Sequence, residues 1–225
     1  MLLSAFHVST PTMVYKHWLN AALFYLFHAD SVEPEKYLCY LESVAKAFVF
    51  DRFLASGEGA DYYDMIYQSN VLCPRHKWEE LDESRLRFGA IENNFVFNYL
   101  DYLLWLNYPN KESNSRVRDY EFTFRSSVEH YYPQNPMPES GLPKMDDDPL
   151  NSFGNLCLIS HSKNSRLSNF SPKAKTDYYK DGAIDSVKQH LMTQIVEQTG
   201  KWDEESIAGH YSDMKAVLVS NLEGA

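Results

Sequence analysis

The sequence predicts a mainly helical protein of the α+β class, with one short strand–loop–strand–helix unit embedded among the helices. Apolar residues recur at helical spacing through much of the first half of the chain. The alternation of aromatic and β-branched residues that is typical of a strand appears in YEFTFRSSVEHYYP, from Tyr120 to Pro133. A short apolar run, GNLCLIS, begins at Gly154 and leads into a polar segment that can start a helix.

Three segments of the first half are expected to be helices. Residues 14–28 are apolar nearly all round, which predicts a buried helix. Residues 36–54 carry their apolar side chains at helical spacing, and residues 95–108 form another strongly apolar segment. The sequences ASGEGAD at 55–61 and PNKESNS at 109–115 break the pattern, because Gly, Pro, Asn and Ser favour turns.

The second half should place two strands on either side of a long loop. Residues 133–149 are rich in Pro and Asp and are expected to form that loop. Residues 161–175 should begin as a helix and continue as a basic loop. Two amphipathic helices, at about 183–199 and 203–221, are expected to close the chain.

The chain is therefore expected to have three parts. Residues 1–115 form a helical lobe, and residues 116–180 form the unit that contains the strands. Residues 181–225 form terminal helices that pack on the other two parts. A length of 225 residues suits one large domain or two modest ones, at about 150 residues per domain.

Composition indicates a globular protein of a reducing compartment. Hydrophobic residues make up 44% of the chain and aromatic residues 15%, which is ample for a packed core. No apolar run reaches the roughly 18 residues that a membrane span needs, and the first residues lack the pattern of a signal peptide. Cys39, Cys73 and Cys157 form no CxxC pair, so neither a zinc knuckle nor a disulfide framework is expected. A cytoplasmic location fits this cysteine usage best.

Charge is distributed unevenly along the chain. The formal net charge of -10 argues against indiscriminate binding of nucleic acid, since lysine and arginine supply affinity for phosphates. The segment 161–180 nevertheless carries five basic residues against one acid, Asp177, and so has a net charge of +4. The segment that follows is acidic. The basic segment directly follows the second expected strand, which makes it a candidate for binding an anionic ligand.

Four polar residues in this region have the chemistry of phosphodiester hydrolysis. His130 can act as a general base, because the pKa of a histidine lies near neutrality. The carboxylate of Glu129 and the amide oxygen of Asn164 are hard ligands suited to Mg²⁺. Asn155 can orient the base. Each of these residues alone has an ordinary structural explanation, as a surface carboxylate, a turn residue or a helix-surface amide, and only their conjunction favours a site.

The same residues carry a resemblance to a known family. The sequences VEHYYP, FGNLCLIS and HSKNSRLSNFSPKAK resemble the three blocks of the HNH (ββα-metal) endonuclease motif, and the nine residues from Asn155 to Asn164 match its usual spacing. More narrowly, they resemble the C-terminal nuclease region of modification-dependent (type IV) restriction proteins of the GmrS/GmrD kind. The fold that the resemblance implies is mainly α with an embedded ββα-metal unit at residues 116–180.

The resemblance implies a role for each residue. His130 would be the general base, and Asn155 would position the loop that follows it. Glu129 and Asn164 would bind Mg²⁺ or Mn²⁺. Residues expected to contact DNA phosphates are Lys163, Arg166, Lys173 and Lys175, and those expected to lie just behind the site are His161 and Asn169. We expect the first strand to end or bulge at Glu129 and His130, so that both side chains face one phosphate.

The implied function is metal-dependent endonucleolytic cleavage of DNA, in restriction and antiviral defence. Relatives carry an N-terminal ParB-like nucleotide-binding half with an Asp-Gly-Gln-Gln-Arg type motif, which this sequence lacks. The resemblance therefore implies a C-terminal fragment, or a subunit whose partner supplies that half, and a homodimer if both strands are to be cut. Two alternatives remain open. One is a DNA-binding module whose HNH-like site is inactive, and the other is a helical interaction scaffold.

Overall fold

The computed structural model describes residues 1–10, 12–68, 76–167, 169–180 and 182–223. This part of the chain is mostly helical and contains a small antiparallel sheet, which confirms the α+β prediction. The α-helices are α1 (Leu2–Ser9), α2 (His17–His28), α3 (Pro34–Ala47), α4 (Phe95–Leu106), α5 (Ser115–Arg118), α6 (Asp147–Leu150), α7 (His161–Leu167), α8 (Pro172–Tyr179), α9 (Val187–Thr199) and α10 (Glu204–Glu223). The strands are β1 (Ser127–His130) and β2 (Leu156–Ile159).

Shorter 3₁₀ and π-helical segments connect these elements. The 3₁₀ segments are η1 (Met13–Tyr15), η4 (Trp78–Glu80), η5 (Glu83–Arg85), η6 (Lys111–Ser113), η7 (Pro138–Ser140) and η8 (Phe153–Asn155). The π-helical segments are η2 (Phe48–Phe53), which continues α3 directly, and η3 (Asp64–Gln68). None of the helices in the described residues is long and apolar enough to cross a membrane.

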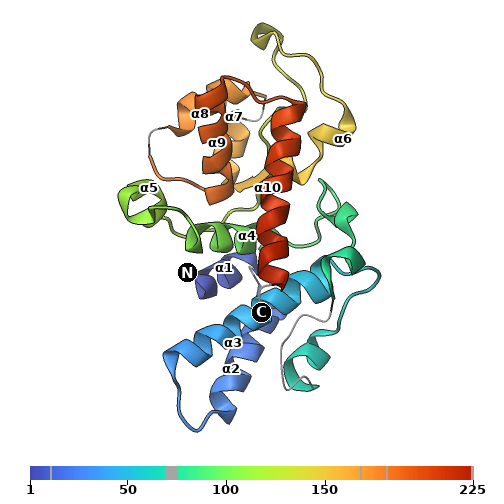
Figure 1. Cartoon of the computed structure of the whole chain (residues 1–225), viewed down its shortest axis with the longest axis vertical. Coiled ribbons are helices and arrows are strands. Elements are labelled where there is room, and N and C mark those ends of the chain that lie inside the picture. The colour runs from blue at the N-terminus through green and yellow to red at the C-terminus, as the bar shows by residue number, and fades with distance from the viewer. Residues whose placement is uncertain (11, 69–75, 168, 181, 224–225) are drawn as a thin grey trace.

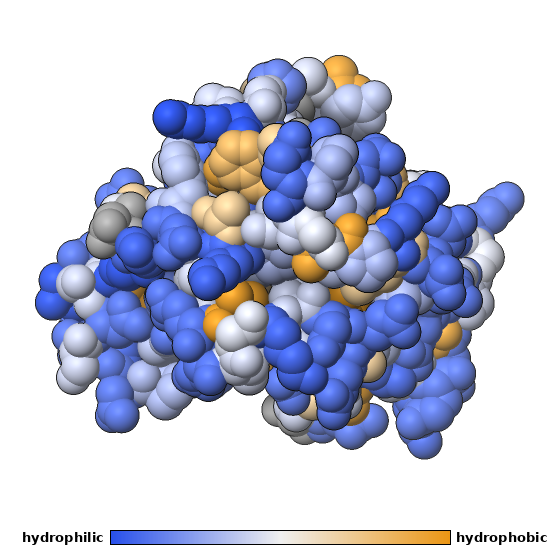
Figure 2. All heavy atoms as spheres, turned by 90° about the horizontal axis from the view of Figure 1, so that it is seen from above, coloured by the Kyte–Doolittle hydropathy of each residue, from blue (hydrophilic) through white to orange (hydrophobic). Residues whose placement is uncertain are grey.

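Helices α4 and α10 form the middle of the molecule. Figure 1 shows α2 and α3 at one end and α7, α8 and α9 at the other, with α4 between them, while α10 runs from beside α9 past α4 towards α3. Helix α4 contacts α1, α9, α10 and β2, and α10 also packs against η8. From the end where α9 connects to α10, the surface is mostly hydrophilic with small separate hydrophobic patches (Figure 2).

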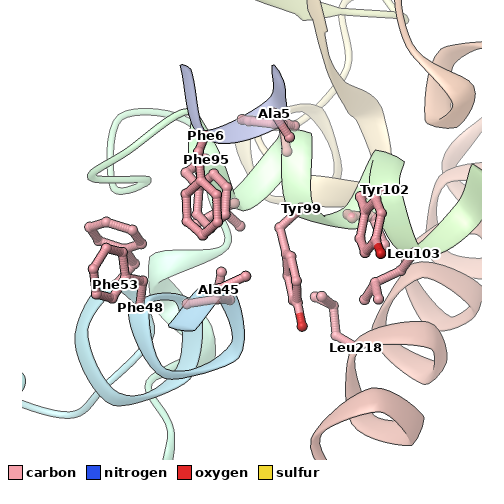
Figure 3. Packing of buried hydrophobic residues seen from close by; sticks show 14 of the residues in the cluster. Ala5, Phe6, Ala45, Phe48, Phe53, Phe95, Tyr99, Tyr102, Leu103 and Leu218 are labelled. Carbon is pink, nitrogen blue, oxygen red and sulfur yellow. The ribbon is translucent and has the colours of Figure 1, made fainter. Parts of the chain in front are cut away.

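One large apolar core joins the three parts of the chain. Figure 3 shows Phe6 of α1 stacked on Phe95 of α4, with their ring centroids 4.5 Å apart. Phe48 packs edge-on against Phe6. Leu218 of α10 belongs to the same buried cluster and lies on the other side of α4. Phe153 of η8 belongs to the same buried cluster. Burial of each such side chain contributes about 1.5–3 kcal/mol, so this core anchors the strand-containing unit to the helices.

The two terminal helices are confirmed, and local capping fixes their ends. The Ser186 side chain accepts a hydrogen bond from the Gln189 backbone N–H, which caps the start of α9. Gly200 ends α9 with a φ of 74°, a left-handed conformation that glycine adopts at little cost. Helix α10 then runs back along α4 and η8, and so touches both other parts of the chain.

The strands form where the sequence indicates but are shorter than expected. Ser127 pairs with Ile159 and His130 pairs with Leu156 in an antiparallel register. Residues 120–126 lie outside this ladder, although their sequence alternates as a strand does. The reason is the length of the partner, because β2 supplies only four residues and a strand needs a partner for its backbone hydrogen bonds.

Two expectations about helices were wrong. Helix α2 is not buried on all sides, since Leu23 and Phe27 are 55% and 84% exposed. The expected basic loop after residue 167 contains helix α8. Its start carries a recognisable signal, because Ser171 caps the helix and Pro172 occupies its first turn.

Candidate active site

Strand β1 ends at Glu129 and His130. Glu129 pairs with Cys157 and His130 with Leu156, so the ladder is regular up to its last pair and has no bulge there. Neighbouring side chains on a regular strand point to opposite faces. The strand end was expected, but the two side chains have separate sets of partners instead of facing one point.

The imidazole of His130 is held by Asn151. Nε2 of His130 lies 3.0 Å from Oδ1 of Asn151. An amide oxygen only accepts hydrogen bonds, so Nε2 carries the proton and Nδ1 keeps its lone pair. The ring also lies edge-on to Phe88, with centroids 4.4 Å apart. This arrangement fixes the tautomer in which Nδ1 can accept a proton.

Burial keeps His130 neutral. Burial lowers its pKa below the usual 6.5, and the nearby charge of Lys175 lowers it further. The hydrogen bond to Asn151 acts in the opposite direction without cancelling the effect of burial. At neutral pH the side chain is therefore in the form that a general base requires.

Glu129 lies in a buried ion pair with Lys175 of α8. Nζ of Lys175 is 2.5 Å from Oε1 of Glu129 and 2.6 Å from the backbone oxygen of His130. Burial raises the pKa of Glu129 and lowers that of Lys175, while the attraction between them opposes both shifts. The lysine thus links the carboxylate of one residue to the backbone of the next.

Lys175 was expected to contact DNA phosphate, and the structure corrects this expectation. Its side chain is 0% exposed, because it enters the interior between α8 and β1 to reach Glu129. A buried ammonium that already donates to a carboxylate and a carbonyl oxygen has no access to a phosphate. Lys175 is instead placed to hold the two site residues of β1.

Asn155 fixes the backbone that follows His130. Its Oδ1 accepts hydrogen bonds from the Tyr132 backbone N–H at 2.7 Å and from Nε1 of Trp202 at 3.0 Å. Its Nδ2 donates to the backbone oxygens of Tyr132 and Leu150. Four bonds on a side chain with no exposed surface leave little freedom. The amide, at the entry to β2, ties together the exit from β1, the end of α6 and the connection from α9 to α10.

Lys188 supports the same turn, a role that the sequence did not predict. Its buried Nζ donates to the backbone oxygens of Phe153 at 2.7 Å and Leu156 at 2.5 Å, on either side of Asn155. Burial lowers its pKa to about 7. No local pattern marks Lys188, Trp202 or Asn151, because each meets the site only through the tertiary fold.

Helix α7 follows β2 directly and lies against β1. Asn164 is half-buried in α7, and its backbone N–H bonds to the oxygen of Ser160. His161, at the start of α7, and Asn169, after its end, are both exposed. The order strand, strand, helix is therefore present.

The basic residues of α7 and α8 fall into different environments. Lys163 bonds to Oδ1 of Asp185 at 2.9 Å. Arg166 is exposed and lies 5.4 Å from the ring centroid of Tyr178. Lys173 is exposed at the start of α8. Arg166 and Lys173 are thus the members of the expected phosphate-binding set that solvent reaches most freely.

The side chains expected to bind the metal are of types that Mg²⁺ accepts, but the carboxylate of Glu129 is already paired with Lys175. Among the described residues, no group of three or more His, Cys, Asp and Glu side chains could hold a metal ion. Mg²⁺ often takes only one or two protein carboxylates and fills its other positions with water and phosphate. Glu129 and Asn164 are compatible with such a site in kind. Any ion at Glu129 must share that carboxylate with Lys175.

The fold and this polar centre define a mostly helical α+β domain with a buried, neutral imidazole at the end of a strand. The chain belongs to the family of the C-terminal domain of GmrSD restriction endonucleases, which it matches over residues 78–217. The match spans more than half of the chain and contains every residue of the candidate site. Comparison with curated proteins gave no match, and neither did comparison with solved structures.

Membership of this family confirms the resemblance to the GmrS/GmrD nuclease region. It identifies the chain as a restriction endonuclease domain, which implies nuclease activity with DNA as the substrate. The family match ends before the last residues of α10 and begins at η4, so it includes α4, both strands and the helices around them.

Proposed function

We propose that the chain hydrolyses DNA phosphodiester bonds by an HNH-type, metal-dependent mechanism with His130 as the general base. The observation that carries the proposal is the neutral, buried imidazole of His130, whose Nε2 is held by Asn151. A base of this kind removes a proton from water at neutral pH. The family assignment supplies DNA as the substrate.

In the proposed reaction, water attacks the phosphorus as Nδ1 of His130 takes its proton. The bond from phosphorus to the leaving sugar oxygen breaks, and that oxygen takes up a proton from solvent. Asn155 keeps the backbone after His130 in place through its bonds to Tyr132. Arg166 and Lys173 contact neighbouring phosphates, since both are exposed cations near the site elements.

Glu129 and Asn164 would hold the Mg²⁺ or Mn²⁺ ion. When bound, the ion supplies charge stabilisation for the phosphate and the leaving oxygen. His161, which starts α7, and Asn169, which follows its end, would lie just behind the site. Since a single site makes one cut, cleavage of both strands would require two copies of the chain or two binding events. The proposed nucleotide-binding half would be supplied by another domain or subunit.

A second candidate function is DNA binding without cleavage. The specific observation in its favour is the Glu129–Lys175 ion pair, which occupies a carboxylate that the metal would need. In that case the exposed cations would still bind the phosphate backbone, but the ion would not bind at Glu129.

Nicking of supercoiled plasmid distinguishes the two candidates. The purified chain is incubated with plasmid in Mg²⁺, in Mn²⁺ and in EDTA, and calorimetry measures metal binding to the same samples. The nuclease proposal predicts open circles in metal and none in EDTA, together with metal binding that Glu129→Ala removes. A chain that binds the plasmid but neither nicks it nor binds metal would establish the second candidate.

A further inference from the structure

A pocket of about 640 Å³ opens beside the candidate site. It lies between the loop around η7, the start of α8 and the connection from α9 to α10. This connection lies at the end of the molecule that Figure 2 views, where hydrophobic patches are surrounded by hydrophilic residues. The volume falls within the range of about 300–1,000 Å³ that is typical of small-molecule sites.

The inner wall of the pocket is apolar and partly aromatic. Buried side chains that line it include Met145, Val196, Trp202 and Tyr132. The hydroxyl of Tyr132 donates to the backbone oxygen of Pro143, which fixes the ring against the loop. The wall thus presents apolar side chains and an anchored aromatic ring, which suit a flat ligand with apolar faces.

The rim of the pocket carries charges of both signs. Lys144 and Lys173 are exposed cations on the side formed by the loop and α8. On the side of α10, Lys201 is paired with Asp203 at 2.8 Å, and Glu204 is exposed. The cations can hold a phosphate, and the carboxylates can accept hydrogen bonds from amino or imino groups.

The pocket shares its framework with the candidate site. Tyr132 lies two residues after His130, and its backbone N–H donates to Oδ1 of Asn155. Nε1 of Trp202 donates to the same oxygen. Helix α8 lines the pocket with Lys173 and reaches Glu129 with Lys175. A ligand in this pocket would therefore lie against the same loop and helix that position the proposed base.

We propose that this pocket binds one nucleobase of the DNA strand, unstacked from its neighbours, with its 5′-phosphate near Lys144 and Lys173. A nucleobase combines flat apolar faces with a polar edge, which matches the apolar wall and the carboxylate rim. A base within a duplex cannot enter a pocket, so the strand must turn it outward. The inference rests on the proposed function, because DNA must bind at the adjacent site.

Deoxynucleoside 5′-monophosphates test the pocket without any cleavage. Each of the four is titrated into the full chain by calorimetry, beside deoxyribose 5-phosphate, which has the phosphate but no base. We expect at least one nucleotide to bind ten times or more tightly than the sugar phosphate. Leu142→Trp should weaken that binding at least tenfold, because Leu142 is a half-buried residue of the pocket wall. Leu38→Trp is the matched control, on α3, where Leu38 is 45% exposed.

Equal binding of the sugar phosphate, no binding of any nucleotide, or unchanged binding in Leu142→Trp would each overturn the proposal. Circular dichroism checks that the variants fold, and Ser140→Trp, also in the pocket wall, replaces Leu142→Trp if that variant unfolds. Plasmid nicking by the same preparation distinguishes failure of the pocket proposal from failure of the proposed nuclease function. Nicking without nucleotide binding rejects the pocket alone, whereas a chain that neither nicks plasmid nor binds DNA rejects the proposed function as well.

Discussion

Asn151 is the residue whose role the sequence concealed. The motif predicts that Asn155 orients His130, but in the structure Asn151 contacts the imidazole and Asn155 bonds to the backbone. The nine-residue spacing from Asn155 to Asn164 identifies a motif, yet it carries no information on which amide meets which ring. That depends on how the 133–149 loop returns to β2, and no local rule fixes the path of a loop of this length.

Replacement of Asn151 should affect the rate and the pH dependence together. Asn151→Ala removes the acceptor for Nε2, so we expect kcat to fall about 10- to 100-fold, as for other residues that orient a catalytic ligand. The hydrogen bond to Asn151 raises the pKa of His130, so its loss should lower that pKa and move the acid limb of the rate profile to lower pH. Asn151→Asp keeps an acceptor and should recover part of kcat. A fall in activity with an unmoved acid limb would contradict this role.

The Glu129–Lys175 pair should behave as a coupled unit in unfolding. Lys175→Met leaves a buried carboxylate without its cation, so the free energy of unfolding should fall by about 3–5 kcal/mol. The double variant Glu129→Leu/Lys175→Met should lose much less than the sum of the single variants. Urea denaturation measures all members of the cycle. A loss below about 1 kcal/mol for Lys175→Met would show that the pair does not stabilise the fold.

The 3₁₀ segment η8 packs closely against helix α10. Gly154 has no room for a side chain, since a Cβ there would lie 2.2 Å from the backbone oxygen of Ile207. Gly154→Ala must push α10 away, and we expect a loss of about 2–3 kcal/mol in the free energy of unfolding, as in other overpacked sites.

Gly209 of the same helix provides the matched control. No atom lies within 4 Å of a Cβ placed on Gly209. Gly209→Ala should therefore stabilise the protein by about 0.5–1 kcal/mol, because alanine favours a helix interior over glycine. Thermal denaturation of both variants measures the difference. Equal effects of the two substitutions would contradict the close approach of η8 and α10.

The periodicity of apolar residues correctly predicted most of the long helices and the positions of both strands. Helices α3, α4, α9 and α10 lie where apolar spacing predicted them, and both strands lie within the predicted runs. Periodicity could not set strand length, because the number of pairs depends on β2. Nor could it show that α2 leaves Phe27 exposed, since that depends on which surfaces the other helices cover.

The whole molecule should lose stability in mild acid. Burial lowers the pKa of His190 to about 4 and that of His210 well below 6.5. Nδ1 of His190 and Nε2 of His210 are buried without a hydrogen-bond partner among the described residues. Below pH 6.5 the unfolded chain takes up protons that the folded chain excludes, so the free energy of unfolding falls as pH drops from 6.5 towards 4.

Urea midpoints at pH 7 and pH 5 measure this acid dependence. His190→Gln should reduce the loss of stability between these pH values by about 1 kcal/mol, with allowance for partial screening by solvent. His28→Gln changes an exposed histidine of α2 and should leave the loss unchanged. Parallel pH dependence in His190→Gln and the unmodified chain would contradict the assignment.

The most direct test of the central claim is the nicking rate of supercoiled plasmid by His130→Ala, measured beside His28→Ala in the same metal ion. If His130 is the general base, His130→Ala should lower the rate by about 10²- to 10⁴-fold while it still binds DNA. His28→Ala should cleave as the unmodified chain does, because His28 is the last residue of α2, and α2 lies at the opposite end of the molecule from α7, α8 and α9 (Figure 1). Cleavage by a folded His130→Ala at the rate of the unmodified chain would contradict the claim and show that another group acts as the base.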